Sequence, residues 1–440
     1  MSSILTRVRA HLERGLLAQR HFRTMWAAST ITSFGGQISL LALPLTAVVI
    51  LNATPRQMGM LAALEAVPFT LFSLPVGVFI DRMRKLPILL GCDALIGLTL
   101  LAIPVMDHFG GLTMGVLYGV GFVLGSAFVV VGTAAQVYLT QLAGRSRLIE
   151  ANSLFTASDS GARLTGPGLA GALIQWLGAP YAVLFDSFGF LLSFSLMTRI
   201  GFREERREQE PRLQVFKEIG EGLQLVRTNP ILRTLTWCAG VWFLFFQGFL
   251  ALETLFASRE LGLSAGQIGV AHMIGGSGAL LSATCARRLT RSLGMGTPIL
   301  LGMLASGLSW ILLAAIPRGA ASFVLAGGAL FFLDFGATTY WINYSSLRQS
   351  VTPDALLGRM TATMRFFTVA GAPLGAYAAG MLGESLGLRA TLLATGCGVS
   401  VLALVAFFGS RLRHIPDLSR PKASREDLDS GLGTGLGQPT

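Results

Sequence analysis

The chain has 440 residues, of which 52% are hydrophobic and only 13% are charged, and its formal net charge at pH 7 is +11. This number of charged residues is too small to cover the surface of a soluble protein of this length. The composition therefore predicts a membrane protein. The apolar residues gather in runs much longer than the strands of a transmembrane β-barrel, which excludes that class.

Twelve apolar runs follow one another along the chain, each long enough for a helix that crosses about 30 Å of hydrocarbon. The fold class that we predict is therefore an all-α membrane protein with twelve transmembrane helices. The runs cover residues 24–51, 57–80, 86–106, 111–139, 150–177, 180–200, 231–258, 265–286, 297–317, 320–345, 357–383 and 387–409.

Basic residues are distributed unevenly between the loops that join these runs. If the N-terminus is cytoplasmic, only Arg56, Arg259, Arg318 and Arg389 face the opposite side. Because basic residues in short loops are retained in the cytoplasm, this bias predicts that both termini are cytoplasmic. The positive charge then indicates an anionic membrane surface as a partner, and not a nucleic acid.

One long polar segment divides the chain between the sixth and seventh runs. Within it, apolar residues recur at helical spacing between charged ones, which predicts an amphipathic helix on the membrane surface. We therefore predict five parts: a cytoplasmic arm (1–23), an N-terminal six-helix bundle (24–200), a cytoplasmic linker with the amphipathic helix (201–230), a C-terminal six-helix bundle (231–409) and a disordered cytoplasmic tail (410–440).

The two halves carry traces of an internal repeat. The stretch TPRQMGML (Thr54 to Leu61) returns as SAGQIGVA (Ser264 to Ala271), and Gln37 and Gln247 are separated by the same offset. Duplicated six-helix halves are typical of transporters whose binding site lies between the repeats, near the middle of the membrane.

The loop GVFIDRMRKLPI (Gly77 to Ile88) places Asp81 beside Arg82, Arg84 and Lys85. This pattern resembles the loop between the second and third helices of the major facilitator superfamily. The resemblance implies the major facilitator fold, and it implies that Gly77, Asp81 and the basic residues form a latch at the inner gate. The alternative is that the charged residues are ordinary anchors at the membrane surface.

The stretch from Arg145 to Ser193 is similar to the branch of that superfamily that includes macrolide efflux proteins and the enterobactin exporter. The fifth run also resembles the antiporter motif of the superfamily, which implies that Gly166, Pro167 and Gly171 take part in gating. Glycine lets a neighbouring helix approach closely, and proline removes a backbone hydrogen bond and allows a bend. A kinked helix without a gating role is the alternative.

Ionisable side chains in hydrocarbon cost about 2.5 to 3.5 kcal/mol each, so those inside the runs are candidates for function. We predict that Glu65, Asp159 and Asp334 take part in proton coupling, with fixed structural pairing as the alternative. The four-residue spacing of Asp159 and Arg163 predicts an ion pair on one helix face. His272 is interpreted as a buried packing residue.

By the resemblance, several of these runs surround a central cavity, and aromatic residues are frequent in two of them, WCAGVWFLFFQGF and FFLDFGATTYWINY. Part of these rings should face lipid or other helices, and the remainder should line a pocket for amphipathic or cationic organic solutes. The polar residues that we predict in this cavity are Gln37, Arg163, Gln247, Glu253, Asn343 and Arg365.

Other classes of function find little support in the sequence. Each of the four cysteines stands alone in an apolar run, which argues against a disulfide framework or a metal site. No phosphate-binding loop for ATP occurs, and no nucleophile or metal-ligand cluster indicates an enzyme. We therefore expect no catalytic activity and no cofactor.

The function that we predict is secondary active transport. The protein should export a small amphipathic compound, drug-like or siderophore-like, by alternating access with proton antiport. The alternatives are an importer or facilitator of a small solute, and a membrane-embedded enzyme. We expect a monomer in a bacterial cytoplasmic membrane, with the lipid bilayer, a small-molecule substrate and protons as its partners.

Overall fold

The computed structural model of the chain describes residues 15–201, 215–353, 356–410 and 412–415, and every regular element in these residues is a helix. Most of the predicted arm and tail, and the first part of the linker, lie outside the described residues. The surroundings of Gly77 and the side chains of Asp81 and Arg82 also lie outside the described part of the chain, so their predicted latch stays a prediction.

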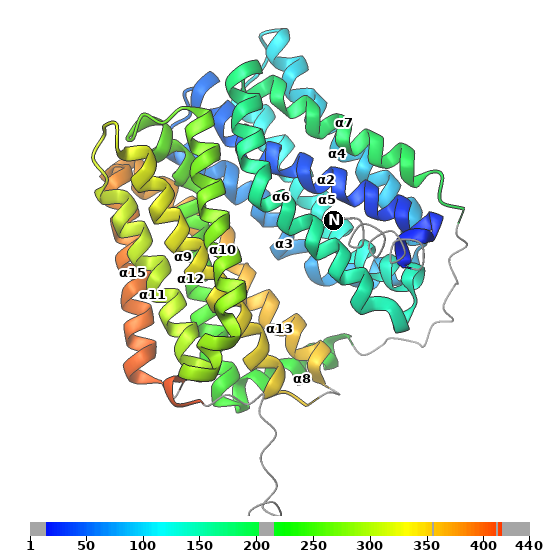
Figure 1. The fold of residues 1–440 in the computed structure, drawn as a ribbon, viewed down its shortest axis with the longest axis vertical. Helices are drawn as coiled ribbons and strands as arrows, with labels where there is room; N and C mark the ends of the chain where they lie inside the picture. The colour runs from blue at the N-terminus through cyan, green and yellow to red at the C-terminus, as the bar shows by residue number, and fades with distance from the viewer. Residues whose placement is uncertain (1–14, 202–214, 354–355, 411, 416–440) are drawn as a thin grey trace, which may run out of the picture.

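The first half of the chain forms an N-terminal bundle, which Figure 1 shows in blue to green. Within it, α2 packs against α6 and α7, α4 against α5 and α7, and α3 against α5. The six helices are α2 (Arg20–Leu45), α3 (Pro55–Arg82), α4 (Lys85–His108), α5 (Met114–Ala143), α6 (Leu148–Leu177) and α7 (Ala179–Met197). A short π-helical turn, η2 (Thr46–Ile50), continues α2 after Pro44.

The second half forms a C-terminal bundle, preceded by the linker helix α8 (Val215–Thr228). Here α9 packs against α14 and α15, α10 against α12, and α11 against α12 and α15. The helices are α9 (Pro230–Arg259), α10 (Ala265–Leu293), α11 (Gly296–Ala315), α12 (Ser322–Ser350), α13 (Leu357–Ala370), α14 (Ala372–Leu386) and α15 (Leu388–Gly409).

Most of the long helices are apolar enough to cross a membrane, as the hydropathy predicted. In the described residues, 10 segments meet both criteria of length and composition, and the pair α13–α14 counts as one of them. The other two predicted spans coincide with α3, with 28 residues, and α6, with 30 residues, which are long enough but are not among these 10 segments. The chain is thus a multi-pass membrane protein. The single run predicted at 357–383 is divided, because α13 ends before Gly371 and α14 begins after it.

The two bundles meet along two pairs of helices, α3 with α14 and α6 with α10. These pairs correspond to each other in the internal repeat. Helices α3 and α10 belong to the second span of their halves, and α6 and α14 belong to the fifth. The repeat is also visible locally. Thr54 and Ser264 each form a capping box, in which the side chains of Gln57 and Gln267 return a hydrogen bond to the backbone of the capping residue.

The two ends of the molecule are named after a residue at each. The Thr54 end is the end at which α3 and α10 begin, with Thr54 and Ser264. The Arg147 end is the opposite one, at which α6 begins next to Arg147 and α13 begins near Arg359.

Candidate functional site

At the Thr54 end, the two bundles are in direct main-chain contact. A Cβ added at Gly59 of α3 would lie 2.6 Å from the Cα of Gly380 on α14. On the other side, a Cβ at Gly171 of α6 would lie 3.1 Å from the Cα of Gly269 on α10. Only glycine allows helices to approach so closely, so both seams depend on these residues. Gly171 is one of the residues that the sequence assigned to gating.

Hydrogen bonds between the bundles reinforce these seams. Gln175 of α6 accepts hydrogen bonds at Oε1 from the hydroxyl of Ser264 (3.2 Å) and from the N–H of Gly266 (3.0 Å). At the other seam, the N–H of Arg56 donates to Glu384 Oε2 at 3.2 Å. The state described here is therefore closed at the Thr54 end.

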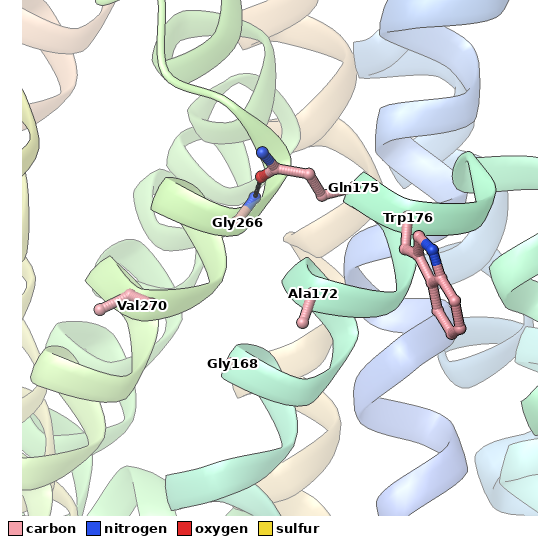
Figure 2. Close-up of a pocket in the computed structure, with 6 residues that line it drawn as sticks. All are labelled: Gly168, Ala172, Gln175, Trp176, Gly266 and Val270. Atoms are coloured by element: carbon pink, nitrogen blue, oxygen red, sulfur yellow. Dashed lines mark hydrogen bonds between the residues drawn. The ribbon is translucent and has the colours of Figure 1, made fainter.

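A hollow of about 420 Å³ lies beside the seam between α6 and α10. Figure 2 shows its lining residues, with Gln175 reaching across to the start of α10: Gly168, Ala172, Gln175, Trp176, Gly266 and Val270. His272 follows Val270 by two positions, which is about 200° around a helix. The hollow thus lies on a different face of α10 from His272, and it belongs to the seam.

Charged side chains from both bundles gather around α10, nearer the middle of the membrane. Glu253 of α9 is buried, with 6% of its surface exposed, and its Oε1 lies 3.3 Å from Nε2 of His272. Asp334 of α12 lies one turn further along α10, because its Oδ2 would be 2.7 Å from a Cβ on Gly275. We call Glu253, His272, Asp334 and Arg163 the charged cluster.

Arg163 joins this cluster from the other bundle. Its carbonyl oxygen lies 3.4 Å from the position of a Cβ on Gly276, so this part of α6 faces the same stretch of α10. The arrangement thus brings together two carboxyl groups and an imidazole, and Arg163 of the other bundle lies at the same stretch of α10. Such a site can hold a proton or an organic cation.

The ion pair predicted between Asp159 and Arg163 is not formed in the described part of the chain. Asp159 instead accepts a hydrogen bond from the hydroxyl of Ser33 on α2, at 2.6 Å. The prediction was wrong because helical spacing fixes which residues share a face of α6 but does not fix which neighbouring helix offers a better partner. The side chain of Arg163 is exposed.

The other candidates in the N-terminal bundle lie apart from the charged cluster. The side chain of Glu65 packs on α5, where a Cβ at Gly121 would be 2.9 Å from its Cγ. Gln37 of α2 lies against Gly166 of α6, with 2.6 Å between the Gln37 Cγ and a Cβ at that glycine. Gly166 therefore gives Gln37 its place between α2 and α6.

The candidates of the C-terminal bundle fall into different surroundings. Asn343 is buried, and its Oδ1 accepts a hydrogen bond from Thr290 at 2.7 Å while its amide donates to the Thr339 carbonyl. Gln247 of α9 is half-buried and Arg365 of α13 is exposed. Asn343 thus takes part in the contact between α10 and α12.

Several of the aromatic rings expected to line a pocket fill the core of the C-terminal bundle. Trp242 stacks on Phe246 at 4.8 Å and contacts Tyr340 at 4.9 Å. Phe249 stacks on Trp310 of α11, also at 4.9 Å. All of these rings except that of Phe246 are fully or almost fully buried, so they hold α9, α11 and α12 together.

Two of the predicted latch residues have described side chains. Arg84 is exposed, whereas Lys85 is buried and donates a hydrogen bond from Nζ to the carbonyl oxygen of Met83 at 2.7 Å. Pro167, the remaining gating candidate, lies inside α6, and its main chain faces Gly269 of α10. Its position at the α6–α10 seam agrees with a role in the contact between the bundles.

The family model of the Major Facilitator Superfamily matches residues 25–368. The chain belongs to the Major Facilitator Superfamily. It is 28% identical over 411 residues to the multidrug efflux pump Tap of Mycolicibacterium fortuitum, with 90% of this chain and 97% of that protein covered. The identity to Tap of Mycobacterium tuberculosis is 27% over 428 residues, with 94% of this chain and 96% of that protein covered.

Solved structures of this superfamily share the fold. A variant of the nucleoside transporter NupG matches with a TM-score of 0.74 at 11% identity, over 88% of this chain and 99% of that one. A bacterial homologue of the iron transporter ferroportin, in an inward-facing state, matches with a TM-score of 0.71 at 17% identity, over 90% of this chain and 99% of that one. The major facilitator fold predicted from the loop at Gly77 is thus confirmed.

Sequence reasoning gave His272 no part in this superfamily member's site, although it placed Glu253 and Asp334 among the candidates. A histidine one or two turns inside an apolar run is a weak signal by itself. The available signal was the presence of ionisable residues in three spans, with Glu253 and His272 in the outer halves of their runs and Asp334 near the middle of its run.

Proposed function

We propose that this protein is a secondary exporter of small amphipathic compounds, drug-like or siderophore-like, and that it exchanges them for protons by alternating access. The observation that carries the proposal is the charged cluster. Placing ionisable groups in a membrane span costs free energy, so such groups are expected where transport requires them. The similarity to the multidrug efflux pumps named Tap supports export as the direction.

The proposed orientation places the Thr54 end outside and both termini in the cytoplasm of a bacterial cell. The supporting argument is the retention of basic residues on the cytoplasmic side. Arg56, Arg259, Arg318 and Arg389 lie at the Thr54 end, whereas more basic residues lie at the other end: Arg84, Lys85, Arg147, Arg287, Arg288, Arg291, Arg348 and Arg359. In this orientation the described state is closed to the outside.

The proposed organisation keeps the five parts predicted from the sequence, with boundaries at residues 23, 200, 230 and 409. The two glycine seams act as the outer gate, and Gly166 and Pro167 support it by fixing α6 against α2 and α10.

The inner gate uses the latch of Gly77, Asp81, Arg82, Arg84 and Lys85. The bundles of a single chain contain both gates, so the working unit that we propose is a monomer.

In the proposed coupling step, the charged cluster exchanges a proton for a cationic substrate. When the cluster is open to the cytoplasm, a monovalent cationic compound binds beside the Asp334 carboxylate and a proton leaves Asp334. The charge of the cluster is then unchanged, so no uncompensated charge has to cross the hydrocarbon. When the cluster opens to the outside, a proton from the acidic medium replaces the substrate.

The remaining candidates have supporting roles in this proposal. Gln37, Gln247 and Arg365 contribute polar contacts to the cavity, and Glu253 holds His272 beside Asp334. Glu65 and Asp159 are the other carboxyl groups through which protons can reach the cluster. Asn343 keeps α10 and α12 together, since both ends of its amide are already hydrogen bonded within the bundle.

The test uses Asp334→Asn in reconstituted vesicles, with Asp107→Asn at the end of α4 as a control that removes a carboxyl group away from the cluster. Asp334→Asn should abolish accumulation of a dye against its gradient when a pH gradient is imposed, and it should retain downhill exchange. The control should pump like the unmodified protein.

Two results would contradict the proposal. Uphill transport by well-folded Asp334→Asn protein would remove Asp334 from the coupling step. A large loss of folded yield would instead identify Asp334 as the fixed partner of Arg163 or His272, because removing one partner leaves an uncompensated buried charge.

A further inference from the structure

The linker helix α8 packs against α13, the first part of the eleventh span. Glu221 of α8 forms an ion pair with Arg359 of α13. At the next position, a Cβ added to Gly222 would lie 2.8 Å from the carbonyl oxygen of Arg359, so the two helices touch along their main chains. One turn later, Val226 is 5% exposed and belongs to the apolar core that contains Met360 and Met364 of α13.

The eleventh span is interrupted where α13 meets α14. Pro373 has no N–H to donate to the carbonyl group of Val369, four positions earlier. The N–H of Gly371 is directed at that carbonyl oxygen instead. The N–H of Gly371 therefore lacks a regular helical hydrogen bond, although its carbonyl oxygen accepts one from the N–H of Gly375 at 2.9 Å. The two parts are joined by a turn that can bend.

The two parts of this span are held in different ways. A Cβ at Gly375 of α14 would lie 2.8 Å from the carbonyl carbon of Leu244 on α9, and one at Gly380 would lie 2.7 Å from the Cα of Gly59 on α3. These contacts fix α14 in the closed seam. In contrast, α13 runs to the Arg147 end and packs against α8, α9 and α3. Figure 1 shows α8 and α13 side by side at the lower edge of the molecule.

We propose that the Arg147 end is open while the Thr54 end is closed, as alternating access requires, and that α8 is a clamp that holds α13 in its present position. The clamp thereby sets how readily the Arg147 end closes. Closure of this end brings the C-terminal bundle towards the start of α6, and α13 has to leave α8 and pivot at Gly371 to follow. The linker between the bundles is then a control element of the gate. This inference is independent of the substrate, of proton coupling and of the direction of transport.

The test compares Gly222→Leu with Gly220→Leu. The first adds a side chain where α8 meets α13, and the second adds the same side chain at an exposed position where a Cβ meets none of the described atoms within 4 Å. Spin labels at Asn152 of α6 and Gln349 of α12, both exposed at the Arg147 end, report the distance across this end after the four native cysteines are replaced.

Gly222→Leu should raise the ratio of the closed to the open Arg147 end by about fivefold or more, since overpacking by a side chain shifts an equilibrium by at least that factor. Gly220→Leu should leave the distance distribution unchanged. An unchanged distribution in Gly222→Leu, or an equal shift in both variants, would overturn the proposal.

A second variant tests the clamp in the opposite direction and does not weaken the α8–α13 contact. Glu221→Cys combined with Arg359→Cys allows a disulfide to join the two helices. Without spin labels, the oxidised protein should transport slowly, and a reducing agent should restore the rate. An oxidised protein that transports as fast as the reduced one would show that α13 never leaves α8, and would overturn the proposal.

Discussion

Gly171 offers a direct test of the outer gate, because it lies at the closest approach of α6 and α10. A Cβ at this position would be 2.6 Å from the carbonyl oxygen of Ala265 and 3.1 Å from the Cα of Gly269. Real Cβ atoms essentially never come closer than 3.0 Å to such atoms, so Gly171→Ala forces the seam apart. The clash exists only while the Thr54 end is closed, because the seam separates when this end opens.

The magnitude follows from the cost of overpacking, which is about 1 to 3 kcal/mol. If this cost falls on the closed state alone, the ratio of open to closed Thr54 ends should rise by about 5- to 150-fold. Spin labels at His108 and Ala320, which are exposed at the Thr54 end, would measure the ratio as two distances.

Gly161→Ala is the matched control for this experiment. It makes the same change on the same helix, at a position where a Cβ meets none of the described atoms within 4 Å. The control should leave the distances unchanged. If Gly171→Ala also left them unchanged, or if both variants shifted them equally, the assignment of the α6–α10 seam to the outer gate would be refuted.

Three further predictions concern the cluster, the latch and the core. His272→Gln should lose gradient-driven transport but still bind a fluorescent substrate in a polarisation assay, because Glu253 and Asp334 remain; unchanged pumping would exclude His272 from the cluster's function. Asp81→Asn should reach normal abundance in the membrane yet transport poorly, and a wild-type rate would leave Asp81 as a simple anchor. Trp310→Ala removes the fully buried partner of Phe249 and should cost about 3 to 5 kcal/mol of stability. It should lower the thermal unfolding midpoint in detergent, whereas Trp237→Ala at an exposed ring should change it little.

The positions of the helices could be predicted from the sequence because each span must fill the hydrocarbon with apolar residues. The repeat could be recognised for a related reason. Thr54 and Ser264 each begin a helix, and the same pair of hydrogen bonds with Gln57 and Gln267 stabilises both starts. Local rules of helix length and capping thus determined this part of the fold.

The partners of individual side chains could not be predicted in the same way. Hydropathy gives the depth of a residue in the membrane but not the direction in which it points around its helix. Trp242 and Tyr340 were therefore candidates for a pocket, although they pack inside the bundle near Trp310 of α11. The division at Gly371 was missed because its neighbours continue the apolar run on both sides.

The charged cluster shows the same limit more clearly. The sequence placed Glu253, His272 and Asp334 in three separate spans, and only the packing of α9 and α12 on α10 brings them together. The predicted pair of Asp159 and Arg163 failed because Ser33 of α2 competes for the carboxylate. Contacts between helices, and not the pattern within one helix, decided both cases.

The central claim is that the protein exchanges protons for a cationic amphipathic compound, and transport in vesicles of known orientation tests it most directly. The purified protein is reconstituted, and a cationic dye is offered on the cytoplasmic side with the opposite side acidified. The account predicts that the dye accumulates against its concentration gradient, that each transported dye moves a proton the other way, and that a protonophore stops both fluxes. Accumulation that is unaffected by the pH gradient, or dye that only equilibrates, would contradict it.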